Sequence, residues 1–122
     1  MPSLRARAIN RFLRLSTKRL WRPGLDIQQV RGHTARMDAR LGRGATPIAM
    51  EQVEIAGVPA TWFGAPELER RGTLLYLHGG AWCLHLPGIY RRLVTALSHQ
   101  TGMRVLLPDY RLAPEHPFPA GI

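Results

Sequence analysis

A short glycine-containing segment in the middle of the chain offers the clearest chemistry: His78-Gly79-Gly80-Ala81-Trp82. Paired glycines allow the backbone to turn sharply and to present bare N–H groups to a ligand. Two or three such amides directed at one point can stabilise a developing negative charge, as in an oxyanion hole. Phosphate-binding loops also use glycines, but the G-x-G-x-x-G and G-x-x-x-x-G-K-[ST] patterns are both absent. The alternative interpretation is a simple glycine turn.

A second motif covers residues 109–120 and reads Asp-Tyr-Arg-Leu-Ala-Pro-Glu-His-Pro-Phe-Pro-Ala. Its three prolines predict a rigid, non-helical loop. Charged side chains within it offer a local ion-pair network that would hold the loop in shape: Asp109, Arg111 and Glu115. Taken alone, the motif is also consistent with a purely structural connection.

The elements around the two motifs follow the order strand, helix, strand. Residues 73–77 and 104–107 are short apolar runs, typical of strands buried on both faces. Between them, apolar residues at helical spacing predict a helix that Gly102 ends: Leu86, Tyr90, Leu93, Val94 and Leu97. In such a βαβ unit the strands are parallel, and ligands bind beyond their carboxyl ends, where both motifs lie.

The segment before this unit predicts a β-hairpin and a surface loop. Residues 51–56 alternate between apolar and polar side chains, and residues 60–63 return after a turn at Gly57-Val58-Pro59. Residues 66–72 are polar and charged, which is typical of a loop at the surface.

The excess positive charge lies in the first third of the chain. Residues 1–43 hold eleven of the seventeen Lys and Arg residues but two of the eight acids, whereas residues 44–122 are neutral overall. Helical spacing predicts an amphipathic helix over Leu4–Trp21. A second helix is predicted from Asp26, its N-cap, to Leu41, with a thin apolar face: Ile27, Val30, Ala35, Met37 and Leu41.

Three interpretations of the first helix are open. We favour a helix that packs its apolar side on the rest of the protein. The alternatives are contact with a membrane surface through Leu4–Trp21 and a cleaved transit peptide. Nucleic-acid binding is not expected, because no recognition motif or stacking aromatic accompanies the charges.

Together, residues 74–120 resemble the hormone-sensitive-lipase-like branch of the α/β-hydrolases. That family has a strand, a His-Gly-Gly-Gly-Trp loop, a helix, a second strand and then the twelve-residue motif. The resemblance implies an α/β protein, the N-terminal part of an α/β-hydrolase fold with an incomplete sheet. Residues 1–43 would form two cap-like helices, and residues 48–122 a partial hydrolase domain. The implied activity is hydrolysis of small carboxylic esters without a cofactor.

The resemblance also assigns roles to individual residues. Gly79, Gly80 and Ala81 would form the oxyanion loop, with the backbone amides of Gly80 and Ala81 as donors. His78 would hold the loop in shape, and Trp82 would border the acyl or alcohol pocket. The second motif would brace the floor of the site through Asp109, Tyr110, Arg111, Glu115 and His116. The family most often has glycine at position 81, and a positive φ there costs alanine about 1 kcal/mol.

The catalytic triad is absent from the 122 residues. No G-x-S-x-G elbow occurs, and the three serines, Ser3, Ser16 and Ser98, lie in other contexts. The resemblance places the triad serine, acid and histidine after these residues. We therefore expect a truncated chain that is poorly folded and inactive as an esterase, with a free apolar edge at residues 73–77. The alternatives are a non-catalytic module that binds a small ligand and a membrane-surface module.

The other candidate sites are weaker. Cys83 beside His78 or His85 is a possible nucleophile, but nothing in the sequence orients a base, so a packing role is expected. The five histidines show no metal-ligand spacing, and we expect no metal site. No apolar run approaches the ~18 residues of a membrane span. Without a convincing export signal, a cytoplasmic location is the default expectation.

Overall fold

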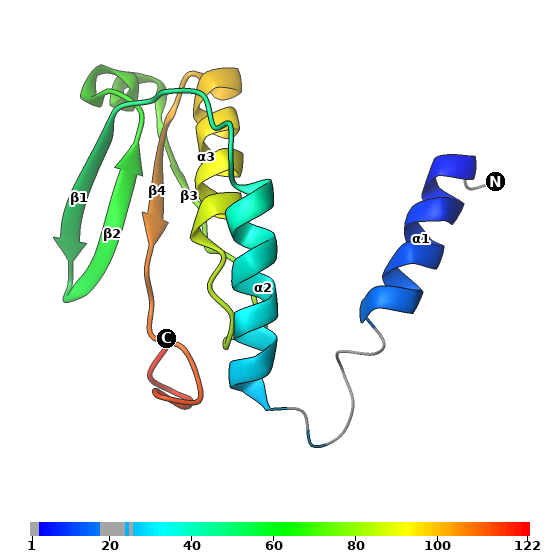
Figure 1. The fold of residues 1–122 in the computed structure, drawn as a ribbon. Coiled ribbons are helices and arrows are strands. Elements are labelled where there is room, and N and C mark those ends of the chain that lie inside the picture. The colour runs from blue at the N-terminus through cyan, green and yellow to red at the C-terminus, as the bar shows by residue number, and fades with distance from the viewer. Residues whose placement is uncertain (1–2, 18–23, 25) are drawn as a thin grey trace. The chain divides into compact units, whose positions relative to one another are not determined.

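The computed structural model describes residues 3–17, 24 and 26–122, and the chain divides into two compact units, Met1–His33 and Thr34–Ile122. Helix α1 (Leu4–Thr17) lies in the first unit, and the division falls within helix α2 (Ile27–Leu41). The second unit holds a four-stranded sheet with helix α3 (Figure 1). Its elements are β1 (Met50–Ile55), β2 (Val58–Phe63), the 3-10 helix η1 (Pro66–Arg71), β3 (Thr73–Leu75), α3 (Pro87–Thr101) and β4 (Arg104–Pro108).

Helix α1 confirms the first predicted helix over most of its length. The Ser3 hydroxyl accepts a hydrogen bond from the N–H of Ala6 at 3.2 Å, which caps the helix start. The predicted continuation over residues 18–21 lies outside the described residues. Several large apolar side chains of α1 are exposed: Leu4, Ile9, Phe12, Leu13 and Leu15. None of the helices in the described part of the chain has the length and hydropathy of a membrane span.

Helix α2 begins where the sequence predicts. Oδ1 of Asp26 accepts a hydrogen bond from the N–H of Gln28 at 2.9 Å, as an N-cap residue does. The predicted apolar face is wrong at its C-terminal end, because Met37 and Leu41 are 41% and 51% exposed. The buried residue on that turn is the charged Asp38, which is 7% exposed.

The buried Asp38 carboxylate joins the C-terminal half of α2 to the start of α3. Its two oxygens accept hydrogen bonds from the N–H groups of Gly88 and Ile89, at 2.9 and 2.7 Å. These amides belong to the first turn of α3, where the helix has no internal acceptor for them and where negative charge is favourable. The two helices touch closely here, because a Cβ on Gly42 would lie 2.5 Å from Cα of Gly88.

The predicted hairpin is present, but its turn lies one residue earlier than expected. Ala56 and Gly57 form the turn with φ values of +52° and +78°, and Val58 and Pro59 already pair with β1. A two-residue turn with both φ values positive matches the twist of the flanking strands, so it is preferred in short hairpins.

The strand–helix–strand unit is confirmed. The sheet order is β1-β2-β4-β3, with β3 and β4 parallel and the other pairs antiparallel. Helix α3 lies against the sheet (Figure 1), and the core joins Phe63, Val94 and Val105. The face predicted for α3 is only partly right: Leu93 is 42% exposed, whereas Ser98 is 1% exposed. Ser98 is tolerated there because its hydroxyl donates to the carbonyl of Met103 at 2.8 Å.

Strand β3 differs from the predicted strand over residues 73–77. It is shorter, and it is not buried on both faces, since Leu75 and Leu77 are 60% and 64% exposed. The reason is its position at the end of the sheet order, where β4 is its one paired neighbour among the described residues. An apolar edge strand of this kind is the feature that the sequence predicted for residues 73–77.

A buried arginine joins β4 to the hairpin and to η1. The 3-10 helix η1 lies where the sequence predicts a surface loop, at residues 66–72. Arg104 is 5% exposed, and its guanidinium forms ion pairs with Glu51 of β1 and Glu69 of η1. Nε donates to the carbonyl of Gly64 at 3.2 Å, and the guanidinium lies 4.7 Å from the ring centroid of Trp62. Burial by itself lowers the pKa of Arg104, but hydrogen bonds to Glu69 and Glu51 more than offset this and raise it.

Candidate active site

The glycine loop turns sharply at Gly80. The φ angle of Gly80 is +132°, and Ala81 and Trp82 follow with φ values of +53° and +59°. The carbonyl of Gly80 accepts hydrogen bonds from the N–H groups of Cys83 and Leu84, at 3.1 and 2.8 Å. Ala81 therefore has the left-handed conformation that costs a residue with a Cβ about 1 kcal/mol.

Two tyrosines and a histidine hold the backbone carbonyls of the loop. The Tyr90 hydroxyl donates to the carbonyl of Gly79 at 2.6 Å, and the Tyr110 hydroxyl donates to the carbonyl of His78. Nδ1 of His78 lies 2.9 Å from the same Gly79 carbonyl. The His78 ring is 4% exposed and stacks on Tyr110 and Tyr90, with centroids 4.2 and 4.7 Å apart. These contacts fix the His78 ring between the loop and the two tyrosines, and the positioning role that the family resemblance implies for His78 stays a prediction.

The amide side of the loop faces open space. Within the described residues, the N–H groups of Gly80 and Ala81 donate to no protein acceptor. A cavity of about 260 Å³ borders them and is lined by Leu77, His78, Gly79, Gly80, Ala81, Trp82, Tyr110 and Gly121. A second cavity of about 330 Å³ is lined by Trp82, Arg111, Ala113, His116, Phe118, Gly121 and Ile122. Trp82 lines both cavities, and its role at the border of a substrate pocket stays a prediction.

The second motif lies directly beside the loop. The N–H of Ala113 donates to the carbonyl of Trp82 at 2.8 Å, and Nε of Arg111 donates to the carbonyl of Ala120 at 3.0 Å. Asp109 was predicted to form ion pairs within the motif. Its carboxylate instead lies 3.7 Å from Nε2 of His85, which is outside the motif. Asp109 and Arg111 thus stabilise the motif through partners other than each other.

Two residues at this site were not predicted from the sequence. Tyr90 was assigned only to the apolar face of a helix, yet its hydroxyl positions the loop. A phenol on an otherwise apolar helix face that follows a glycine loop is the signal that could have identified it. His85 was considered as a partner of Cys83, and it was dismissed as a metal ligand with the other histidines. Sγ of Cys83 instead donates to the carbonyl of Gly80 at 3.6 Å. That contact fits the packing role expected for Cys83.

Comparison with known proteins identifies the family. Residues 74–122 match a family described as having the alpha/beta hydrolase fold. LipR of Mycobacterium tuberculosis is 37% identical over 101 residues, and an acetyl-hydrolase of Streptomyces hygroscopicus is 34% identical over 108 residues. The crystal structure of an esterase from the bacterial hormone-sensitive lipase family superposes with a TM-score of 0.70 at 30% identity, over 99% of this chain. Residues 74–122 belong to the α/β-hydrolases.

Within the α/β-hydrolases, the chain corresponds to one part of the fold. It covers 32% of LipR and 36% of the Streptomyces acetyl-hydrolase, with 83% and 80% of its own length aligned. It covers 40% of the solved esterase chain. The predicted fold class, the N-terminal part of a hormone-sensitive-lipase-like α/β-hydrolase with an incomplete sheet, is thereby confirmed.

The tyrosines of this hydrolase segment predict a loss of stability in alkali. Burial raises the pKa of Tyr90 and of Tyr110 above the ordinary value of 10.0. A raised pKa in the folded state stabilises the protein below about pH 10, and that stabilisation is lost as pH rises through the folded-state value. We expect the urea midpoint to fall above about pH 10, and to fall less in Tyr90→Phe. An equal fall in both proteins would contradict this assignment.

Proposed function

We propose that this segment supplies the oxyanion-binding part of a serine carboxylic-ester hydrolase that acts on small acyl esters. The observation that carries the proposal is the loop at residues 79–81, where two unpaired amides border a cavity while the loop carbonyls are held by Tyr90, Tyr110 and His78. Backbone amides fixed in this way can bind an oxyanion with little reorganisation.

The reaction follows from the loop and from the family to which residues 74–122 belong. A serine on a G-x-S-x-G elbow attacks the acyl carbonyl, and a histidine oriented by an acid moves the proton. In our proposal, the amides of Gly80 and Ala81 donate to the oxygen of the tetrahedral intermediate, and Trp82 borders the acyl or alcohol group. Each such donor is worth about 3–4 kcal/mol of the barrier in known cases.

The 122 residues by themselves are not expected to turn over esters. They contain no G-x-S-x-G sequence. Of the three serines, Ser98 is buried and donates to the carbonyl of Met103, so its hydroxyl is not available as a nucleophile. A purified chain that hydrolysed a short acyl ester above background would contradict this part of the proposal.

A hybrid enzyme tests the oxyanion role. Residues 74–122 replace the aligned segment of the Streptomyces acetyl-hydrolase, and the rest of that host, with the serine, acid and histidine that we expect in it, is left unchanged. We expect the hybrid to hydrolyse a short acyl ester, because the loop supplies the two donors that the host serine needs. A hybrid with the host serine changed to alanine is the control and should be inactive.

The outcomes separate the catalytic proposal from a non-catalytic binding module. A hybrid that melts cooperatively and binds the ester without turning it over would show that this loop binds a ligand but does not support the reaction. A hybrid with turnover that disappears in the serine-to-alanine control supports the oxyanion role.

A further inference from the structure

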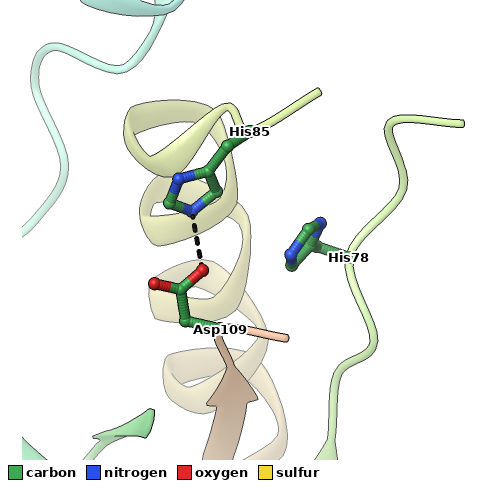
Figure 2. A group of neighbouring side chains, drawn as sticks. All are labelled: His78, His85 and Asp109. Carbon is green, nitrogen blue, oxygen red and sulfur yellow. Dashed lines mark ion pairs between the residues drawn. The ribbon is translucent and has the colours of Figure 1, made fainter. Parts of the chain in front are cut away.

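Three potential metal ligands meet beside the glycine loop although they are separated in the sequence. One ring nitrogen each of His78 and His85 and a carboxylate oxygen of Asp109 all lie within 4.8 Å of one another. Figure 2 shows the His78 side chain pointing toward the pair formed by His85 and Asp109. His78 follows β3, His85 precedes α3 and Asp109 follows β4, so the fold brings them together.

The buried histidine of this group has an unused ring nitrogen. His78 is 4% exposed, and its Nε2 has no hydrogen-bond partner within the described structure. Its Nδ1 lies 2.9 Å from the carbonyl of Gly79, a contact in which Nδ1 carries the proton and donates. In that tautomer Nε2 has a bare lone pair, which is costly to bury without a partner. A histidine that ligates a metal commonly donates its other N–H to a backbone carbonyl in this way.

The remaining two ligands are placed to complete a site that is open to solvent. The side chains of His85 and Asp109 are 43% and 59% exposed, and Nε2 of His85 lies 3.7 Å from Oδ1 of Asp109. Two ligands at ~2.0–2.1 Å from zinc with tetrahedral geometry are ~3.3 Å apart. The exposed side chains therefore need small rotations to reach a common ion, and the fourth position stays free for water.

We propose that His78, His85 and Asp109 form a binding site for Zn²⁺ or a similar divalent transition metal ion. Two imidazoles and one carboxylate suit such an ion better than Ca²⁺ or Mg²⁺, which prefer oxygen ligands. The bound ion joins the glycine loop to the second motif through the side chain that positions the loop. This site is distinct from the two loop amides, and its existence does not depend on ester hydrolysis.

Metal titration of the purified 122-residue chain tests the site. We expect one equivalent of Zn²⁺ to bind in calorimetry and Co²⁺ to give the visible absorption of a four-coordinate ion. Zn²⁺ should shift the ring nitrogen resonances of His78 and His85 more than those of the other histidines. His85→Gln and Asp109→Asn should each weaken binding at least tenfold, since each removes one of three protein ligands.

The matched control is His99→Gln, which removes an exposed histidine from α3. It should bind Zn²⁺ as the parent does. No binding by the parent overturns the proposal. So does equal weakening in His85→Gln and His99→Gln, or nitrogen shifts spread over all histidines, because these results mean adventitious binding to surface imidazoles. The nitrogen shifts are measured on the parent, so this test does not depend on the folding of a variant.

Discussion

Replacement of Gly80 by alanine is expected to destabilise the chain by about 3 kcal/mol. The φ angle of Gly80 is +132°, a conformation that is nearly exclusive to glycine. A Cβ on this residue would lie 2.2 Å from the carbonyl oxygen of Leu84. That oxygen belongs to the backbone, which cannot move aside as the end of a flexible side chain can. Relief of the clash requires opening the turn in which the Gly80 carbonyl accepts two hydrogen bonds.

The neighbouring glycine provides a matched control for this prediction. A Cβ on Gly79 would meet nothing within 4 Å, and its φ lies outside the left-handed range. Gly79→Ala adds the same methyl group and should change the stability by less than about 1 kcal/mol. The rate of thermolysin cleavage under native conditions reports the open fraction, and it should rise about a hundredfold for Gly80→Ala alone. Similar rates for the two variants would show that the turn at Gly80 is not strained by a side chain.

The local elements of this fold could be predicted because their signals are local. Asp26 caps α2, Gly102 follows the end of α3, and both parallel strands coincide with short apolar runs. The glycine loop was predicted from residue type and from its place after a strand. These features depend on a few neighbouring residues, so they can be recognised without knowing what packs on them.

The contacts between distant residues could not be predicted in the same way. Asp38 is not part of the apolar face predicted for α2, yet it binds amides fifty and fifty-one residues later in the chain. The approach of His85 to Asp109 depends on how the loop after Gly80 folds back over the end of β4. The exposure of Leu75 depends on which elements cover β3. Periodicity reports which side of an element is apolar, but not which partner a charged side chain finds.

Arg104 is the charged residue whose pairing has the largest expected effect on stability. Neutralising both partners in the double variant Glu51→Gln, Glu69→Gln leaves a guanidinium that is 5% exposed without a compensating charge. Breaking a buried pair in this way costs about 3 kcal/mol. Arg104→Met removes the buried charge itself. Its former partners have side chains that are 56% and 49% exposed and can be hydrated, so the cost should be smaller, about 1 kcal/mol.

A double variant of the same two elements controls for the loss of negative charge. Glu54 of β1 and Glu67 of η1 are exposed, and Glu54→Gln, Glu67→Gln changes the net charge by the same amount. We expect the parent and the control to have the highest urea midpoints and Arg104→Met to have a lower one. The double variant of Glu51 and Glu69 should have the lowest midpoint of the four proteins. If Arg104→Met were the least stable protein, the guanidinium would stabilise the fold more by packing on Trp62 and bonding to Gly64 than by its ion pairs. The order therefore decides whether β1, η1 and β4 are joined mainly by charge or by contact.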